Sequence, residues 1–130
     1  MDPIKSFMVP SDMFITVERN TDVQTAAGIM RDRRINSLFV TNGKEIIGIL
    51  TDTDMVRRVV AAEVDFLTTT AEKIMSAPIL TIEGDKSVLD ASDLMAQTRV
   101  RHLGVTQDGK LIGMISVRDI LVFLTNLRKK

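Results

Sequence analysis

The pattern of apolar and polar positions predicts the same order of elements twice along the chain. Each copy opens with a short β-prone run, which is followed by turn-forming residues and by an apolar stripe at helical spacing. A residue that favours a helix N-cap precedes each stripe. The predicted elements are strands at 14–17 and 79–82, helix caps at Asp22 and Ser87, and stripes of Val23, Ala26, Ala27 and Met30 and of Val88, Ala91, Leu94 and Met95.

Two further strands and a last helix complete each copy. Asn42-Gly43 and Asp108-Gly109 are dipeptides typical of two-residue hairpins. The strands expected around these hairpins are 37–40 with 46–50, and 102–105 with 111–115. A helix is then expected to open near Asp54 or Asp119. Each copy is predicted to be a βαββα unit, so the fold class is α+β.

One register relates the two copies. Gly48 and Gly113 are 113 − 48 = 65 residues apart, and this offset also pairs Thr16 with Thr81 and Asp54 with Asp119 without a gap. Such a register indicates an internal duplication. A unit of roughly 50 residues cannot bury its sheet alone, so two units are expected to pack face to face. We expect one module over 1–130, with units at 7–62 and 73–127 and a linker at 63–72.

Composition narrows the possible functions. Lys plus Arg equals Asp plus Glu at 17 each, so no net charge attracts the chain to DNA or to an anionic membrane. The absence of cysteine excludes disulfides and thiolate metal sites, and a single histidine argues against a zinc site. No apolar run is long enough to span a bilayer and the N-terminus does not resemble a signal peptide, which predicts a cytoplasmic protein.

Two matched segments could carry chemistry. Residues 48–54 and 113–119 each end a strand with a hydroxyl and place a carboxylate at the start of a helix. Such a carboxylate can accept hydrogen bonds from the two hydroxyls of a ribose, and the helix start favours phosphate. The alternative is a helix cap that needs no ligand.

The residues before the middle strands differ between the copies. Arg101 and His102 stand in the second copy where Asn36 and Ser37 stand in the first. Basic side chains at this point would suit a phosphate, although they could also be solvated. Neither a P-loop nor a Gly-x-Gly-x-x-Gly motif is present, and no catalytic constellation is recognisable, so an enzyme is not expected.

The chain resembles a tandem pair of CBS domains, known as a Bateman module, over essentially its whole length. The resemblance is carried by the two signatures Gly-h-h-Thr/Ser-x-x-Asp, where h is a hydrophobic residue, and by the strand openings Ile15-Thr16 and Leu80-Thr81. The resemblance implies one pseudo-twofold disc with two clefts between its units. It also implies a non-enzymatic sensor for AMP, ADP or ATP, while related members bind S-adenosylmethionine, NAD-type dinucleotides or a divalent metal beside the phosphates. A homodimer formed through the helices and a regulated protein partner in trans are further expectations.

The same resemblance assigns residues to the clefts. In ligand-binding members the signature Asp holds the ribose, the Thr or Ser lies near ribose or phosphate, and partner-unit residues meet the base and phosphates. Cleft A would contain Thr51, Asp54, Thr81, Arg101 and His102, and cleft B would contain Thr16, Asn36, Ser37, Ser116, Arg118 and Asp119. Cleft A is expected to bind more strongly because it has the basic pair, for which Arg118 only partly compensates in cleft B.

Two other functions compete with sensing. A structural dimerisation module with empty clefts would use apolar helix faces, namely Met55-Val56-Val59-Val60 and Leu121-Phe123-Leu124. Nucleic-acid binding would use Arg31, Arg33, Arg34, Arg57, Arg58 and the tail 128–130, but the tail is better explained as a solvated end. Met30, Met55, Met95 and Met114 are expected to pack in the core rather than to hold a cofactor.

Overall fold

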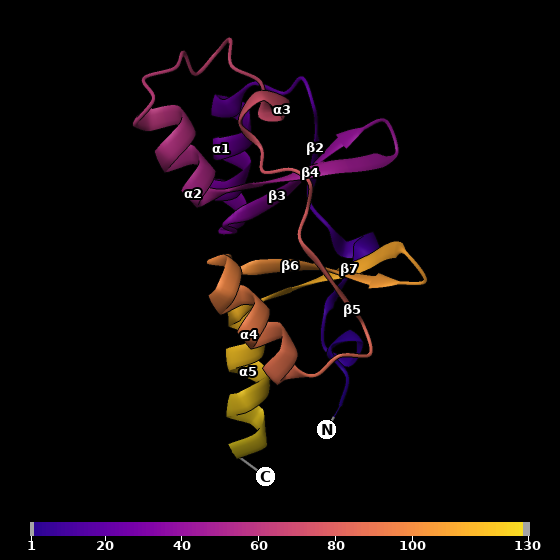
Figure 1. The fold of residues 1–130 in the computed structure, drawn as a ribbon. Coiled ribbons are helices and arrows are strands. Elements are labelled where there is room, and N and C mark those ends of the chain that lie inside the picture. The colour runs from indigo at the N-terminus through magenta and orange to yellow at the C-terminus, as the bar shows by residue number, and fades with distance from the viewer. Residues whose placement is uncertain (1, 129–130) are drawn as a thin grey trace. The chain divides into compact units, whose positions relative to one another are not determined.

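A computed structural model, which describes residues 2–128, contains the βαββα order twice (Figure 1). The predicted α+β class and the duplication are therefore confirmed. The strands β2 and β5 begin two residues later than the sequence predicts. The first copy consists of β2 (Thr16–Glu18), α1 (Val23–Arg33), β3 (Ser37–Asn42), β4 (Glu45–Thr51), α2 (Asp52–Asp54) and the π-helical segment η3 (Met55–Val60). The second consists of β5 (Thr81–Glu83), α4 (Val88–Thr98), β6 (His102–Gln107), β7 (Lys110–Ser116) and α5 (Val117–Arg128).

Both copies build their sheet in the same way. β3 pairs in parallel with β2 and antiparallel with β4, and β6 pairs likewise with β5 and β7. The two-residue hairpin loops are Gly43-Lys44 and Asp108-Gly109, which are 65 residues apart, so the second lies where its dipeptide predicts it and the first lies one residue later than Asn42-Gly43. Gly43 and Gly109 have φ of 65° and 78°, a left-handed conformation that glycine adopts without the steric cost of a side chain. The register of 65 residues thus holds in three dimensions.

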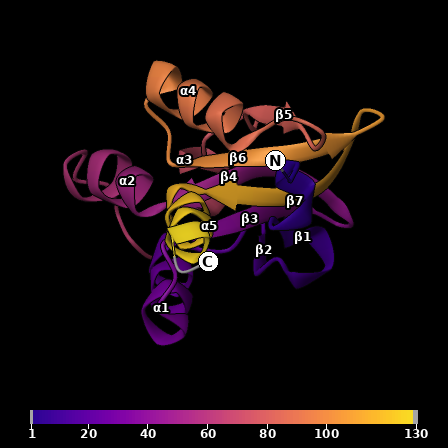
Figure 2. The ribbon, with the colours of Figure 1, turned by 90° about the horizontal axis from the view of Figure 1, so that it is seen from below.

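Within residues 2–128, four short elements lie outside the two copies of the repeat. Three of them, η1 (Ile4–Ser6), β1 (Val9–Pro10) and η2 (Ser11–Met13), precede the first copy, and α3 (Ala71–Ile74) precedes the second. β1 pairs antiparallel with β7, with Val9 opposite Met114, and Figure 2 shows the two strands side by side. Ser76, which follows α3, forms the equivalent bridge with Ile49 of β4. Each copy of the repeat therefore has its sheet extended by the segment that leads into the other copy.

We call residues 4–13 and 71–76 the leading segments of the first and second copies. Backbone hydrogen bonds show that the two segments are equivalent. The N–H groups of Ile4 and Lys5 donate to the carbonyls of Lys86 and Gly84, at 2.9 and 3.0 Å. Those of Ala71 and Glu72 donate to the carbonyls of Thr21 and Arg19, at 2.8 and 3.0 Å, and these two acceptors lie 65 residues before Lys86 and Gly84. The chain accordingly divides into two compact units. The first unit is 14–79, and the second combines residues up to 13 with those from 80 onward.

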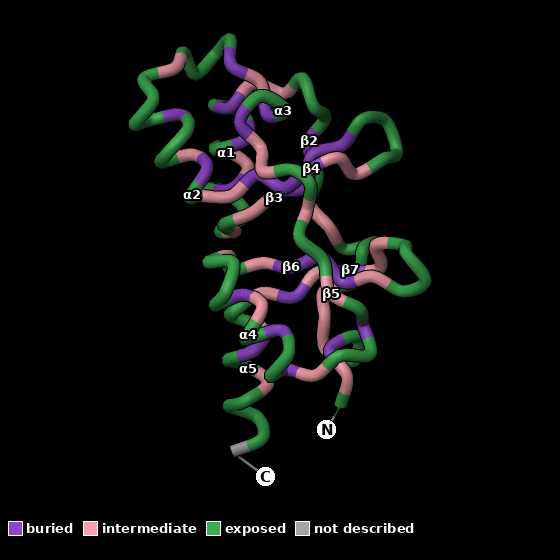
Figure 3. The backbone as a smooth tube through the Cα atoms, in the orientation of Figure 1, coloured by how far each residue is buried: buried purple, intermediate pink, exposed green. Residues whose placement is uncertain are grey.

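Each unit has its own apolar core. Matching positions of the helix and sheet are buried in both, as Figure 3 shows for the central strands. Ala71 and Ile74 contribute to the first core, and Ile4 and Phe7 contribute to the second from the corresponding leading segment. Met30 and Met95 are buried as expected, whereas Met55 and Met114 are only partly buried.

The segment expected as a linker, 63–72, is packed against the first unit. Thr69 is buried, and its carbonyl accepts a hydrogen bond from Val23 N–H at 2.9 Å. The carbonyl of Phe66 accepts from Gln24 N–H at 3.2 Å. These bonds satisfy backbone donors in the first turn of α1 that have no partner inside the helix. The segment thereby contributes to the N-terminal cap of α1.

The helix caps at Asp22 and Ser87 are confirmed. The carboxylate of Asp22 accepts from Thr25 N–H at 2.9 Å, and Ser87 Oγ accepts from Asp90 N–H at 3.1 Å. The carboxylate of Asp90 in turn accepts from Ser87 N–H at 3.1 Å. The backbone bond from Thr25 lowers the pKa of Asp22, and the backbone bond from Ser87 lowers the pKa of Asp90.

These pKa shifts predict how stability depends on pH. Because the folded pKa lies below the ordinary value of 3.8, each charged cap stabilises the protein above that pH and loses its effect as the pH falls through the folded pKa. We expect the stability difference between wild type and Asp22→Asn or Asp90→Asn to shrink as the pH falls below 3.8. Urea unfolding of wild type and each variant at neutral and acidic pH measures this difference in the free energy of unfolding. A difference independent of pH would contradict the assignment, and Asp93→Asn on the exposed face of α4 is the control.

Candidate functional site

Two polar junctions lie where the last strand of each copy meets the following helix. At the first, Thr51 Oγ1 accepts from Asp54 N–H at 3.3 Å, and Asp54 Oδ2 accepts from Thr51 N–H at 3.0 Å. At the second, Ser116 and Asp119 make the same pair of bonds at 3.1 and 2.8 Å. This reciprocal arrangement is a capping box. We call the two sites the Asp54 junction and the Asp119 junction.

The start of the middle strand lies beside each junction. Ser37 is opposite Thr51 in the β3–β4 register, and His102 is opposite Ser116 in the β6–β7 register. Just before these strands, the carbonyl of Asn36 accepts from Asp52 N–H and that of Arg101 accepts from Val117 N–H, both at 3.0 Å. Each junction therefore combines a carboxylate, a hydroxyl and the polar start of a neighbouring strand.

The remaining predicted site residues lie on the strands and helix that flank the junctions. Thr16 and Thr81 are exposed at the starts of β2 and β5, and Arg118 is exposed in the first turn of α5. Each predicted cleft combines residues of the first unit with residues of the second. The assignment of residues to clefts A and B stays a prediction.

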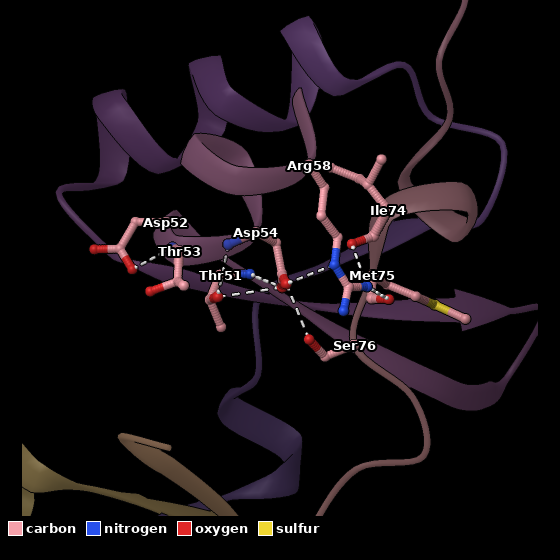
Figure 4. Close-up of polar contacts among 8 residues, drawn as sticks. All are labelled: Thr51, Asp52, Thr53, Asp54, Arg58, Ile74, Met75 and Ser76. Atoms are coloured by element: carbon pink, nitrogen blue, oxygen red, sulfur yellow. Dashed lines mark hydrogen bonds and ion pairs between the residues drawn. The ribbon is translucent and has the colours of Figure 1, made fainter. Parts of the chain in front are cut away.

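Asp54 has two further partners that the sequence analysis did not assign to the site. Figure 4 shows the carboxylate between Thr51, Ser76 and Arg58. Ser76 Oγ donates to Asp54 Oδ1 at 2.9 Å, and Arg58 Nε lies 3.8 Å from the same oxygen. Arg58 also donates to the carbonyls of Ile74 and Met75, at 3.3 and 2.9 Å. The spacing of four residues from Asp54 to Arg58 on a helix could have predicted the ion pair, whereas nothing in the sequence places Ser76 there.

The signature glycines Gly48 and Gly113 have a structural role that the sequence alone does not show. A Cβ at Gly113 would meet the side chain of Met8 and lie 2.6 Å from the carbonyl oxygen of Val9. A Cβ at Gly48 would meet the side chain of Met75 and lie 3.1 Å from the carbonyl oxygen of Ser76. The leading segment crosses each strand at its glycine, so a residue without a side chain is required there. This close approach explains the first position of the signature.

Other features of residues 2–128 concern metal ions, membranes and nucleic acid. Within residues 2–128 there is no group of three or more His, Asp or Glu side chains placed to hold a metal ion. None of the helices in this range has the length and apolar character needed to cross a bilayer. Of the arginines considered for nucleic acid, Arg31 pairs with Asp32 at 2.9 Å and Arg58 with Asp54. Residues 129–130 of the basic tail lie outside the described residues.

Comparisons with known proteins agree on one family for this chain. The CBS domain model matches the chain twice, at residues 4–61 and 71–126. The uncharacterized protein MK0525 of Methanopyrus kandleri is 40% identical over 94 residues, which cover 71% of this chain and 48% of that protein. The chain thus spans about half the length of this relative.

Solved structures with the same fold include a complex with AMP. A protein with CBS domains from Burkholderia ambifaria is 36% identical, with a TM-score of 0.82 over 88% of this chain and 84% of that one. CBSX2, described in complex with AMP, is 20% identical, with a TM-score of 0.79 over 98% of this chain and 99% of that one. At this identity the likeness to CBSX2 establishes the fold alone.

Proposed function

The chain belongs to the CBS domain family and carries the domain twice, and from this premise we propose that it is a regulatory module that binds an adenine nucleotide at its two junctions. CBS-domain proteins of this kind are generally regulatory rather than catalytic. The observation that carries the proposal is the repetition of one polar arrangement, a carboxylate with a hydroxyl at the end of a strand, at Asp54 and at Asp119.

The chemistry of the junctions suits a ribose. A carboxylate has two oxygens and accepts several hydrogen bonds, so it can bind both hydroxyls of a vicinal diol. The family resemblance implies that Arg101, His102 and Arg118 lie near a phosphate, for which guanidinium groups are suitable hydrogen-bond donors. CBSX2, a protein of the same fold, is described in complex with AMP, which makes AMP the first ligand to test. ADP, ATP, S-adenosylmethionine and NAD are the other candidates.

A role in catalysis is not proposed because the hydroxyls are committed to capping. Thr51 Oγ1 donates to Asp54 Oδ2 at 3.2 Å and accepts from Asp54 N–H. Ser116 Oγ donates to Asp119 Oδ2 at 3.0 Å and accepts from Asp119 N–H. Each hydroxyl is thus hydrogen-bonded within its helix cap. Ligand binding at the carboxylates is the activity that we propose.

Calorimetric titration tests the proposal. Wild-type protein is titrated with AMP, ADP, ATP and S-adenosylmethionine, and the titration is repeated on Asp54→Asn/Asp119→Asn. We expect saturable binding of at least one ligand and a loss of about tenfold or more in affinity in the double variant, because each charged acceptor contributes about 1.5–3 kcal/mol to its hydrogen bonds. Asp93→Asn is the matched control. The absence of both binding heat and a thermal shift with all four ligands would refute nucleotide sensing.

Exposed apolar side chains favour a second candidate, a module that acts by protein–protein contact. Val56 and Val60 of η3 are 61% and 63% exposed, and Leu121 and Leu124 of α5 are also exposed. Val59 is buried, and Phe123 stacks on Phe7 at 4.5 Å, so these two positions of the predicted faces serve the cores instead. Homodimerisation through the remaining residues stays a proposal, which sedimentation analysis at several protein concentrations would test.

A further inference from the structure

The carboxylates of the two junctions differ in their partners. We propose that the Asp119 junction is the stronger nucleotide site, because Asp54 is held by Ser76 and Arg58 and must give up these partners before it can accept a ribose. This inference rests on the proposed function.

At the Asp54 junction both carboxylate oxygens are in use. Oδ2 accepts from the Thr51 N–H and hydroxyl, at 3.0 and 3.2 Å. Oδ1 accepts from the Ser76 hydroxyl at 2.9 Å and lies 3.8 Å from Arg58 Nε. The residue is only 5% exposed. Figure 4 shows that these partners surround the carboxylate from the helix and from the crossing segment.

At the Asp119 junction the corresponding partners are replaced by apolar side chains. Val9 lies opposite Met114 as Ser76 lies opposite Ile49, so a valine takes the position of the serine hydroxyl. Phe123 stands 65 residues after Arg58 and stacks on Phe7 instead of reaching the carboxylate. Oδ2 accepts from the Ser116 N–H and hydroxyl, while no hydrogen bond from within residues 2–128 reaches Oδ1. Asp119 is also more exposed than Asp54.

This difference has a direct effect on binding. A ribose diol gains full benefit only from acceptor positions that are not already bonded, because exchange of one bond for another yields little net free energy. At Asp119 the second oxygen is available, whereas at Asp54 a ligand must displace a hydroxyl and separate an ion pair. The resulting order is opposite to the one predicted from Arg101 and His102, which considers only the phosphate.

Single substitutions at the two carboxylates provide the first test. We expect Asp119→Asn to weaken the tighter binding event for AMP or ATP by about tenfold or more, and Asp54→Asn to change it less than about threefold. Thermal unfolding of each variant is measured first, so that titration is carried out where the protein is folded. Loss of the tighter event in Asp54→Asn with its retention in Asp119→Asn would overturn the inference and leave the proposed function standing. Failure of the wild type to bind any ligand would instead refute the proposed function.

Exchanging the surrounding residues between the units provides the second test. Ser76→Val with Arg58→Phe gives the Asp54 junction the surroundings of Asp119, and we expect it to strengthen the weaker binding event by several-fold. Val9→Ser places a hydroxyl near Asp119, and we expect it to weaken the tighter event. These variants keep both carboxylates, so the affinities are compared without loss of either proposed ribose acceptor. If neither exchange changes either affinity, Ser76 and Arg58 do not determine the difference and the inference fails.

Discussion

Replacement of Ile4 by alanine should lower the free energy of unfolding by about 2–5 kcal/mol, although the residue is close to the N-terminus. Ile4 is 0% exposed and packs in the second core with residues from α4, β6 and β7. Its backbone N–H is also bonded to the carbonyl of Lys86. Truncation to alanine removes apolar contacts and leaves a cavity that the surrounding sheet and helices can fill only in part. Urea unfolding at neutral pH measures the change.

Met13→Ala is the control for this prediction. Met13 lies in the same leading segment but is 66% exposed, so its truncation should change stability by less than about 0.5 kcal/mol. Equal effects of the two substitutions would mean that the leading segment does not form part of the second core. The comparison therefore tests the division of the chain as well as the packing of one side chain.

Introduction of a single methyl group at Gly113 should destabilise the protein by about 3 kcal/mol. The new Cβ of Gly113→Ala would lie 2.6 Å from the carbonyl oxygen of Val9, a backbone atom that can move only if β1 shifts away from β7. Gly48→Ala should cost less, because its nearest backbone atom, the carbonyl oxygen of Ser76, lies at 3.1 Å. The same unfolding measurement ranks the two variants.

Gly28→Ala is the matched control with the opposite sign. Gly28 lies inside α1, and its Cβ would meet only the guanidinium of Arg31, at 3.9 Å. Alanine favours the helix over glycine by about 0.5–1 kcal/mol, so this substitution should stabilise the protein. A loss of stability at Gly28, or no loss at Gly113, would show that the close approach of the leading segments is not what requires glycine.

The sequence was sufficient for the parts of the fold that depend on local pattern. The hairpins at Gly43 and Gly109, the caps at Asp22 and Ser87 and the ends of β4 and β7 follow from residue types at short spacing. The junctions were predicted for the same reason, since Thr51 and Asp54 are only three residues apart. The duplication strengthened each of these predictions because every feature occurred twice.

Contacts between distant segments were not predicted. Ile4 corresponds to Ala71 at a spacing of 71 − 4 = 67, so a search at a constant offset of 65 does not align the leading segments. The bond from Ser76 to Asp54 joins residues 22 apart, and only the crossing of β4 by the leading segment brings them together. The π-helical form of η3 was also missed, because its residues have the same apolar spacing as a regular helix.

The pairing of β1 with β7 also determines the order in which the protein can fold during its synthesis. All residues of the first unit have been translated once residue 79 is added, whereas Val9 must wait for Met114, which is made 105 residues later. Ribosomes add roughly 5–20 residues per second, so the leading segment stays without its partner for roughly 5–20 seconds. For that interval Ile4 lacks the side chains of β7 with which it packs in the folded unit. Residues 4–9 are thus synthesised well before the last of the partners with which they form a core and a strand pair.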